Sequence, residues 1–218
     1  MAHLPSIGSP ADFARVFGVS RETIARLETY QALLERWSHV KDLVAPGTMS
    51  QIWYRHFTDS AQLIRLAPDA RCWLDLGSGA GFPGLVVAIL LKGTAGVRVG
   101  LVESNARKCA FLRDVARQTG APVDIFPSRI QELATQNRVD NYDVVTARAL
   151  APLGELLELA TPFFRSETVG LFLKGRTAAD EVREASRRWD FVAELHESLT
   201  ESEARIVEIR RLMPRRRS

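Results

Sequence analysis

The sequence predicts an α/β fold in which a mostly parallel β-sheet carries helices on both faces. Short apolar segments alternate with helical segments from residue 72 onwards, which is the pattern of a parallel sheet. The last two apolar segments have no helix between them, which predicts a closing antiparallel β-hairpin. The first 68 residues show only helical spacing and predict an N-terminal helical extension.

The extension is expected to contain three helices. Ser9 precedes a proline, a combination that starts a helix with a capping side chain and a preset backbone angle. Ser20 caps a second helix, in which apolar side chains recur at roughly helical spacing. Thr48 begins a capping-box pattern and opens a third helix, which is expected to stop at Pro68.

The sheet is expected to form one domain over residues 69–212, followed by a basic tail over residues 213–218. Its predicted strands are residues 72–76, 97–104, 122–126, 142–147, 168–174, 191–199 and 204–212. Helices are predicted at residues 83–91, 105–119, 153–163 and 177–189. With 218 residues, of which 46% are apolar, the chain can bury such a core without disulfides or a metal.

Positive charge is concentrated at the C-terminus. The chain has 29 basic and 26 acidic residues, a net charge of +3, and five of its arginines lie among the last nine residues. The tail is therefore either a solvated end or a contact with an RNA backbone. Arginine supplies 25 of the 29 basic residues, which fits phosphate recognition or a bias of composition.

The cysteines and the apolar segments bear on compartment. Cys72 and Cys109 form no CxxC pair and stand near no histidine cluster, which excludes zinc-ribbon and redox motifs by spacing. Cysteines this sparse suggest a reducing compartment. The first residues lack the pattern of a signal peptide, and the longest apolar run, residues 85–91, is too short to span a membrane. We therefore expect a cytoplasmic protein that binds no metal and no membrane.

A glycine-rich turn follows the first predicted strand. The segment DLGSGAGFPG, residues 75–84, leads from that strand into a helix. Glycines in such a turn permit positive φ angles and let a ligand approach the backbone closely. Glu103 ends the next strand, where a carboxylate can accept both hydroxyls of a ribose. The arrangement predicts a cofactor that contains a ribose.

Two cofactors fit this geometry. Gly79, Gly81 and Gly84 match the GxGxxG fingerprint of dinucleotides, so NAD is one candidate. S-adenosylmethionine is favoured by Asp75, which can face the ammonium group of that cofactor, and by a glycine run that begins at Gly77. The closing strand pair also favours it, because dinucleotide-binding dehydrogenases do not usually have one. A glycine turn that only packs strand against helix is the third possibility.

In addition to this turn, other stretches of the sequence match one family. The chain resembles the bacterial 16S rRNA (guanine-527-N7)-methyltransferase family, known as RsmG or GidB. The resemblance covers about residues 30–212, and its blocks follow one order, which makes it far more specific than the glycine motif alone. The matching stretches are Trp37 with Leu43, Arg55-His56 with Asp59-Ser60, and residues 75–84, 102–113, 128–130, 146–153 and 172–175. It implies a class I methyltransferase fold and methyl transfer from S-adenosylmethionine to N7 of that guanine.

The resemblance also implies cofactor contacts. With the glycine turn included, the predicted cofactor-binding set is Asp75, Gly77, Ser78, Gly79, Phe82, Glu103, Ile130, Gln131 and Arg148. Gly77 and Phe82 are expected to line the methionine and ribose end of the cofactor. Ile130 and Gln131 are expected to flank the adenine, and Arg148 to lie near the transferred methyl group.

This chain departs from the family's pattern at two positions. Gln131 stands where the family often has Glu, which changes little if the adenine contact runs through the backbone or the apolar stem. Asp42 stands where the family usually has Asn, so a role for that side chain does not carry over. The implied partner is 16S rRNA or the small ribosomal subunit, and we expect the chain to act as a monomer.

The residues present also limit which kind of atom can accept the methyl group. A carbon acceptor requires a cysteine nucleophile, and Cys72 and Cys109 lie at a strand start and inside a helix. Exocyclic amines commonly come with an Asn/Asp-Pro-Pro-aromatic motif, whereas residues 146–149 read TARA. Guanine N7 has a free lone pair and needs no proton removed. Methyl transfer is therefore expected to rest on positioning, without a general base.

Arg148 and Lys174 each end a predicted strand, at the edge where open α/β sheets bind ligands. Arg148 is the candidate catalytic residue, in the role of positioning the guanine, and Lys174 is a candidate RNA contact. For both, the alternative is a solvent-facing charge. Arg55 and His56 either form a wall of the substrate pocket, or Arg55 pairs with Asp59 along the helix while His56 packs against the sheet.

Two other functions stay open on the sequence. One is an NAD-binding oxidoreductase on the same fold, although no catalytic Ser/Tyr/Lys or His/Asp constellation is recognisable. The other is an RNA-binding assembly factor that holds the cofactor without activity, which the intact glycine turn and Glu103 argue against.

Overall fold

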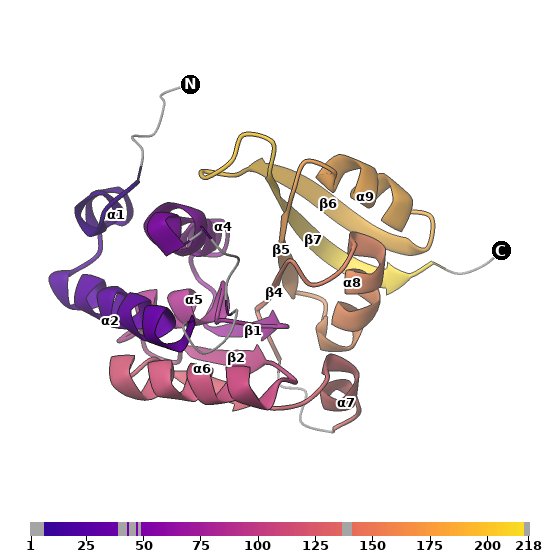
Figure 1. Ribbon diagram of the computed structural model, residues 1–218. Coiled ribbons are helices and arrows are strands. Elements are labelled where there is room, and N and C mark those ends of the chain that lie inside the picture. Colours follow the sequence, from indigo (N-terminus) through magenta and orange to yellow (C-terminus); the bar gives the residue numbers. More distant parts are fainter. Residues whose placement is uncertain (1–6, 39–42, 44–46, 48, 137–140, 216–218) are drawn as a thin grey trace.

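The computed structural model describes residues 7–38, 43, 47, 49–136 and 141–215, and it shows one sheet with helices on both faces (Figure 1). The parallel strands are β1 (Cys72–Leu76), β2 (Arg98–Val102), β3 (Val123–Phe126), β4 (Val144–Arg148) and β5 (Val169–Lys174). They are followed by β6 (Trp189–Glu197) and β7 (Arg205–Pro214), and the order across the sheet is β3-β2-β1-β4-β5-β7-β6. Strand β7 is antiparallel to both of its neighbours. The predicted fold class and closing hairpin are confirmed.

The strand register sets the position of the site. Leu76 pairs with Val102, so β1 and β2 end level and the next residues, Gly77 and Glu103, leave the sheet side by side. On the other side of β1, Asp75 pairs with Thr146 of β4. The strand order reverses between β1 and β4, and ligands of open α/β sheets bind at the carboxyl ends of the strands at such a point.

Helices divide between the two faces of the sheet (Figure 1). Helices α5 (Gly84–Leu90) and α6 (Ala106–Thr119) pack on one face together with the N-terminal extension. Helices α7 (Ile130–Thr135), α8 (Leu153–Ala160) and α9 (Ala178–Ala185), with the 3₁₀ helix η3 (Thr161–Phe163), contribute to a second buried cluster. The predicted segment 153–163 is therefore an α-helix that tightens in its last turn.

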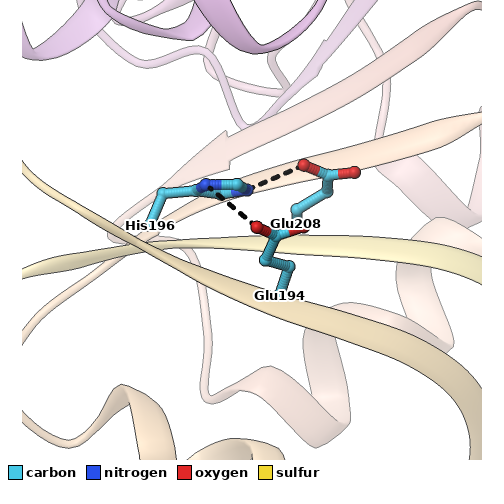
Figure 2. A group of neighbouring side chains, drawn as sticks. All are labelled: Glu194, His196 and Glu208. Carbon is cyan, nitrogen blue, oxygen red and sulfur yellow. Dashed lines mark hydrogen bonds and ion pairs between the residues drawn. The ribbon is translucent and has the colours of Figure 1, made fainter.

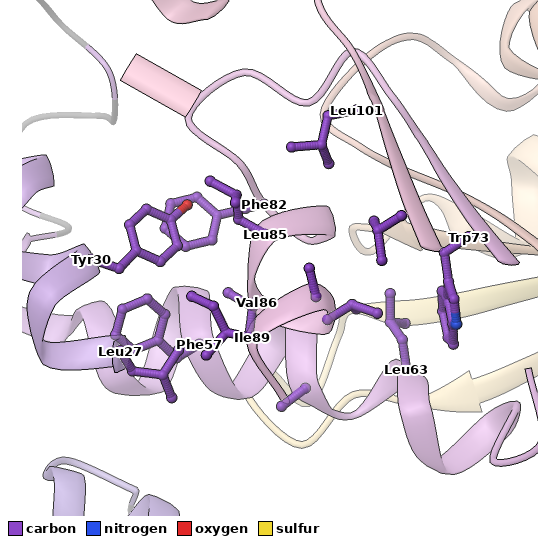
Figure 3. Close-up of a cluster of buried hydrophobic side chains, with 14 of the residues drawn as sticks. Leu27, Tyr30, Phe57, Leu63, Trp73, Phe82, Leu85, Val86, Ile89 and Leu101 are labelled. Atoms are coloured by element: carbon purple, nitrogen blue, oxygen red, sulfur yellow. The ribbon is translucent and has the colours of Figure 1, made fainter. Parts of the chain in front are cut away.

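The N-terminal extension shares its core with the sheet. It begins with α1 (Pro10–Phe17) and α2 (Arg21–Ser38), and Ser9 caps α1 as predicted, by accepting a hydrogen bond from the amide of Asp12. Figure 3 shows Leu27 and Tyr30 of α2 in the same apolar cluster as residues 82–89. Burying one such large apolar side chain contributes about 1.5–3 kcal/mol. The extension is thus held on the sheet by a common core.

The predicted third helix is wrong as a single element. Within the described residues it consists of the 3₁₀ helix η1 (Met49–Gln51), the π-helix η2 (Trp53–Thr58), α3 (Asp59–Ala61) and α4 (Leu63–Leu66); Thr48 lies outside them. The Thr58 hydroxyl donates to the Trp53 carbonyl at 2.7 Å, and the Ser60 hydroxyl to that of His56 at 2.7 Å. Hydroxyls bonded to helical carbonyls bend helices, which accounts for the irregular path.

Candidate functional site

The glycine turn crosses from β1 to α5 at the carboxyl edge of the sheet. Gly77, Gly79 and Gly81 have φ angles of +67°, +57° and +94°, in the left-handed region that favours glycine. The Ser78 amide donates to the Val102 carbonyl at 2.9 Å, which fixes the turn against β2. The Ser78 hydroxyl donates to the Asp75 carbonyl at 3.0 Å, and the Ser78 carbonyl accepts from the Gly81 amide at 2.7 Å, so this buried residue braces the turn and its cofactor contact stays a prediction.

The three glycines face different surroundings. A Cβ at Gly77 would lie 2.7 Å from Leu150, and one at Gly81 would lie 2.6 Å from the Tyr30 hydroxyl, so both are tightly enclosed. A Cβ at Gly79 would meet only the Gly77 carbonyl, at 3.8 Å. The turn is therefore packed on its inner side and open at Gly79, the position at which a ligand can reach the backbone.

Glu103 stands beside this open position. Its side chain is buried, and its two oxygens accept hydrogen bonds from the Gly79 amide at 3.0 Å and the Asn105 amide at 2.8 Å. A carboxylate offers about four lone-pair sites, so two acceptor sites remain for the hydroxyls of a ribose. Cys109 lies behind it, with its thiol 3.1 Å from the Glu103 carbonyl, and burial raises the pKa of that thiol. A protonated, buried thiol is no nucleophile.

Asp75 lies beneath the turn. Its carboxylate accepts hydrogen bonds from the Thr146 hydroxyl at 2.9 Å and the Gly84 amide at 3.2 Å, and only 1% of the residue is exposed. Burial raises the pKa of Asp75 to about 6, although Thr146 and other donors oppose that shift. The carboxylate thus ties the start of α5 to β4, and its contact with a cofactor ammonium stays a prediction.

Asp75→Asn is expected to stabilise the folded chain at pH 7.5. An Asp pKa raised from 3.8 to about 6 means that the folded chain binds more protons than the unfolded chain between these pH values. The ionised carboxylate therefore lowers stability increasingly as pH rises from about 4 to 6, by about 1–3 kcal/mol once ionisation is complete. Urea unfolding should show a gain for the variant at pH 7.5 that shrinks towards pH 4.5; an equal difference at both values would contradict the assignment.

Phe82 joins the glycine turn to the N-terminal extension. Its ring stacks on that of Tyr30, with centroids 5.3 Å apart and an angle of 20°, and on His56, at 4.8 Å and 22°. The Tyr30 hydroxyl also donates to the Ala80 carbonyl in the turn. The Arg148 guanidinium lies 4.9 Å from the Phe82 centroid, within cation–π range. Nothing in the sequence around Tyr30 marked it as a site residue, since its partners lie about 50 residues away.

His56 is held in its neutral form. Burial lowers the pKa of its imidazole to about 3, and the positive charges of Arg148 and Arg55 act in the same direction. At physiological pH it is therefore an uncharged ring packed on Phe82, and too weak a base to remove a proton from a substrate.

A cavity of about 530 Å³ opens beside Phe82, at the carboxyl ends of β4 and β5. Its lining includes the four residues that the sequence predicts for substrate: Arg55, His56, Arg148 and Lys174. The structure thus brings these four together, from η2, β4 and β5. Turn residues 77–79 and Glu103 are not part of this lining, so the cavity is a separate compartment beside the turn.

The ion pairs in this cavity differ from the expected pairing of Arg55 with Asp59. Arg55 does not form the expected pair along the helix: it pairs with Glu201 at 3.5 Å, and Asp59 pairs with Arg148 at 3.5 Å. Lys174 is 10% exposed in its side chain and pairs with Glu181 at 2.6 Å. Lys174 is therefore a largely covered, paired charge in this structure, and its RNA contact stays a prediction.

Ile130 and Gln131 begin α7, directly after β3. Ile130 is buried and Gln131 is exposed, so an apolar and a polar side chain lie just after the end of β3, the strand that pairs with β2. This short helix was not among the predicted elements. A signal was present in Glu132, whose carboxylate accepts a hydrogen bond from the Arg129 amide at 3.1 Å and caps the first turn.

One group among the described residues has the composition of a metal site. Figure 2 shows Glu194 and His196 of β6 with Glu208 of β7. The two ring nitrogens of His196 face different carboxylates, Glu208 at 2.8 Å and Glu194 at 3.8 Å, and Glu208 also accepts from Arg210 at 2.5 Å. Glu194 and Glu208 are direct cross-strand partners, and the charge of Arg210, which pairs with Glu208, offsets that repulsion. The three side chains bond to one another and to Arg210, so they link the two strands of the hairpin.

Comparison with known proteins decides the family. The model of the GidB family, rRNA small subunit methyltransferase G, matches residues 23–212. The chain belongs to this family. Proteins named ribosomal RNA small subunit methyltransferase G include one from Methylorubrum populi (strain ATCC BAA-705 / NCIMB 13946 / BJ001), 54% identical over 191 residues, which cover 88% of this chain and 90% of the relative. Another, from Caulobacter vibrioides (strain NA1000 / CB15N), is 46% identical over 202 residues, which cover 93% and 91%.

Solved structures agree on the fold of this GidB family member. Cofactor-bound Rv0187 from MTB superposes with a TM-score of 0.60 at 15% identity, covering 95% of this chain and 98% of that one. The O-methyltransferase from Bacillus cereus in complex with SAH gives a TM-score of 0.55 at 12% identity, covering 93% and 100%. The resemblance inferred from sequence and the class I methyltransferase fold are therefore confirmed. Among the described residues, no helix has the length and apolarity needed to cross a bilayer.

Proposed function

We propose that this GidB family member transfers a methyl group from S-adenosylmethionine to N7 of a guanine in 16S rRNA, the family target being guanine 527. The observation that carries the proposal is the junction at Phe82: an open glycine turn with Glu103 lies on one side and a polar cavity on the other. A methyl donor in the turn and an acceptor base in the cavity would meet at this junction. We place the protein in the cytoplasm, where ribosomes are modified.

The residues present fit the cofactor. Gly79 leaves space above the turn, and Glu103 keeps acceptor sites for both ribose hydroxyls. Ile130 supplies an apolar surface at the next strand end, where an adenine would lie. When bound, S-adenosylmethionine supplies an electrophilic methyl group on a sulfonium. Its position in the turn would bring that group towards Phe82 and Arg148.

The cavity residues act by holding the base. The fork of Arg148 is suited to the guanine O6 edge, which carries N7 beside it. His56 is neutral and packed, so it confines the base without exchanging a proton. N7 attacks with its own lone pair, and the chain contributes orientation and exclusion of water from the junction. This description needs no general base and no metal.

Arg215, the last described residue of the basic tail, lies far from this junction. Strand β7 starts at Arg205, which lines the cavity, runs antiparallel to β5 as far as Ile209, and continues along β6 to Pro214. Ten residues of strand span about 30 Å, so residue 215 lies at the opposite edge of the sheet. Its guanidinium pairs with Asp190 at 3.1 Å. An RNA contact made by Arg215 would therefore be with a segment distant from the target guanine; Arg216 and Arg217 lie outside the described residues.

Mapping N7-methylguanine tests the proposal. Purified protein with S-adenosylmethionine should place a methyl group on N7 of one guanine in 16S rRNA from cells that lack the gene. Naked 16S rRNA and small subunits are offered separately, because either is a possible substrate. Binding of NAD instead of S-adenosylmethionine would support the oxidoreductase alternative. Cofactor binding without methylation of either substrate would support an inactive assembly factor.

A further inference from the structure

We propose that Asp59 is a positioning residue for methyl transfer, and that it acts by fixing and neutralising the Arg148 guanidinium at the junction of the glycine turn and the cavity. This inference rests on the proposed function, because it concerns the same site. The N-terminal extension would then contribute to catalysis, because it supplies the Asp59 carboxylate, whereas β4 supplies Arg148.

Groups from two other parts of the chain hold the Arg148 side chain. Its Nη1 lies 3.5 Å from Asp59 Oδ2 and donates to the Arg55 carbonyl at 3.2 Å. Its guanidinium also lies 4.9 Å from the Phe82 ring centroid. Asp59 provides the ion pair of this guanidinium, and we infer that this pair sets its orientation. A side chain at the end of a strand would otherwise have several rotamers open to it.

Asp59 is itself held rigidly. Its Oδ1 accepts from the Thr200 hydroxyl at 3.0 Å and from the Gln62 amide at 2.9 Å, which leaves Oδ2 to face Arg148. Its side chain is only 15% exposed. Burial raises its pKa, and the charge of Arg148 and the Thr200 hydroxyl oppose that shift. The carboxylate is thus held in place through Oδ1, while Oδ2 pairs with Arg148.

Neutralisation follows from the charge pattern of the cavity. Arg55 has Glu201 and Lys174 has Glu181, so each of these two cations already has a carboxylate of its own. Asp59 is the carboxylate that offsets Arg148. A sulfonium and an N7-methylated guanine both carry positive charge, and an unpaired guanidinium nearby would repel both. The Asp59–Arg148 pair lets an arginine recognise the guanine at a place where positive charge passes from donor to acceptor.

The test compares Asp59→Asn with wild type by two measurements. Asn keeps the size of the side chain and removes its charge. The kcat/KM for methylation of 16S rRNA should fall about 10- to 100-fold, because the guanidinium is no longer held in place. Calorimetry should show that S-adenosylmethionine binds about three- to tenfold more weakly relative to S-adenosylhomocysteine, whose sulfur is uncharged. The second measurement does not depend on turnover.

A double-mutant cycle separates this role from a purely structural one. If Asp59 acts through Arg148, then Asp59→Asn should cost less than twofold in a chain that already carries Arg148→Gln. Asp114→Asn is the matched control, because it removes a carboxylate that is 21% exposed and pairs with Arg117 on α6, outside the cavity lining, and it should keep the rate within threefold. An equal loss in both backgrounds, or an unchanged ratio of the two affinities, would overturn the inference. If wild type itself methylates no guanine N7, the proposed function fails instead.

Discussion

Gly79→Arg is expected to weaken the binding of S-adenosylmethionine at least 100-fold and to leave the chain folded. The Cβ position at Gly79 is open, so an arginine would project into the space that we assign to the cofactor. The backbone has φ of +57° there, which costs a non-glycine residue about 1–2 kcal/mol. That cost is small enough for the sheet and its shared core to remain intact. Titration calorimetry with the cofactor and a melting curve measure the two effects.

Gly96→Arg is the matched control for this substitution. Gly96 also has a positive φ, +79°, and open space around its Cβ position, but it precedes β2 at the edge of the sheet away from Glu103. Both variants should melt at similar temperatures, and only Gly79→Arg should lose the cofactor. If Gly79→Arg binds as wild type does, the cofactor does not lie over this turn, and the proposed function loses its structural basis.

The periodic features of the sequence were enough to predict the sheet. Strands β1, β2, β4 and β5 are short apolar segments between turn residues, and such segments are buried on both faces in a parallel sheet. The glycine turn and Glu103 were also predictable from local sequence. A few adjacent residues are enough to indicate positive φ angles and a carboxylate at a strand end. The absence of a helix between residues 199 and 204 likewise predicted the hairpin.

Side-chain partners from distant segments were not predictable in this way. Spacing along the chain suggests an ion pair between Arg55 and Asp59. In the structure, Asp59 pairs with Arg148 of β4, and Arg55 pairs with Glu201. Asp75 was placed correctly at the strand end, yet its carboxylate points to Thr146 and Gly84. A local window contains the residue types of a site, whereas the direction of each side chain depends on partners that only the fold brings near.

Arg148→Gln is expected to lower kcat/KM for methylation of 16S rRNA by about 100- to 1000-fold, the usual range for loss of one preorganised donor at a reacting group. Glutamine retains some polar character but loses the charge and the fork that suit the guanine edge. S-adenosylmethionine should bind no more weakly than to wild type, because the substitution removes a positive charge near the sulfonium. A large loss in rate with undiminished cofactor binding is the signature of a substrate-positioning residue.

Two further measurements make this result specific. Arg188→Gln removes an exposed arginine that pairs with Glu158 at the opposite edge of the sheet, and it should leave the rate within twofold. Arg148→Gln also leaves the Asp59 carboxylate buried without its partner, which destabilises a fold by about 3–5 kcal/mol when burial is complete and less at 15% exposure. The rate must therefore be measured well below the melting temperature of the variant. If the folded variant then methylates RNA at the wild-type rate, Arg148 does not position the guanine, and its ion pair with Asp59 serves stability alone.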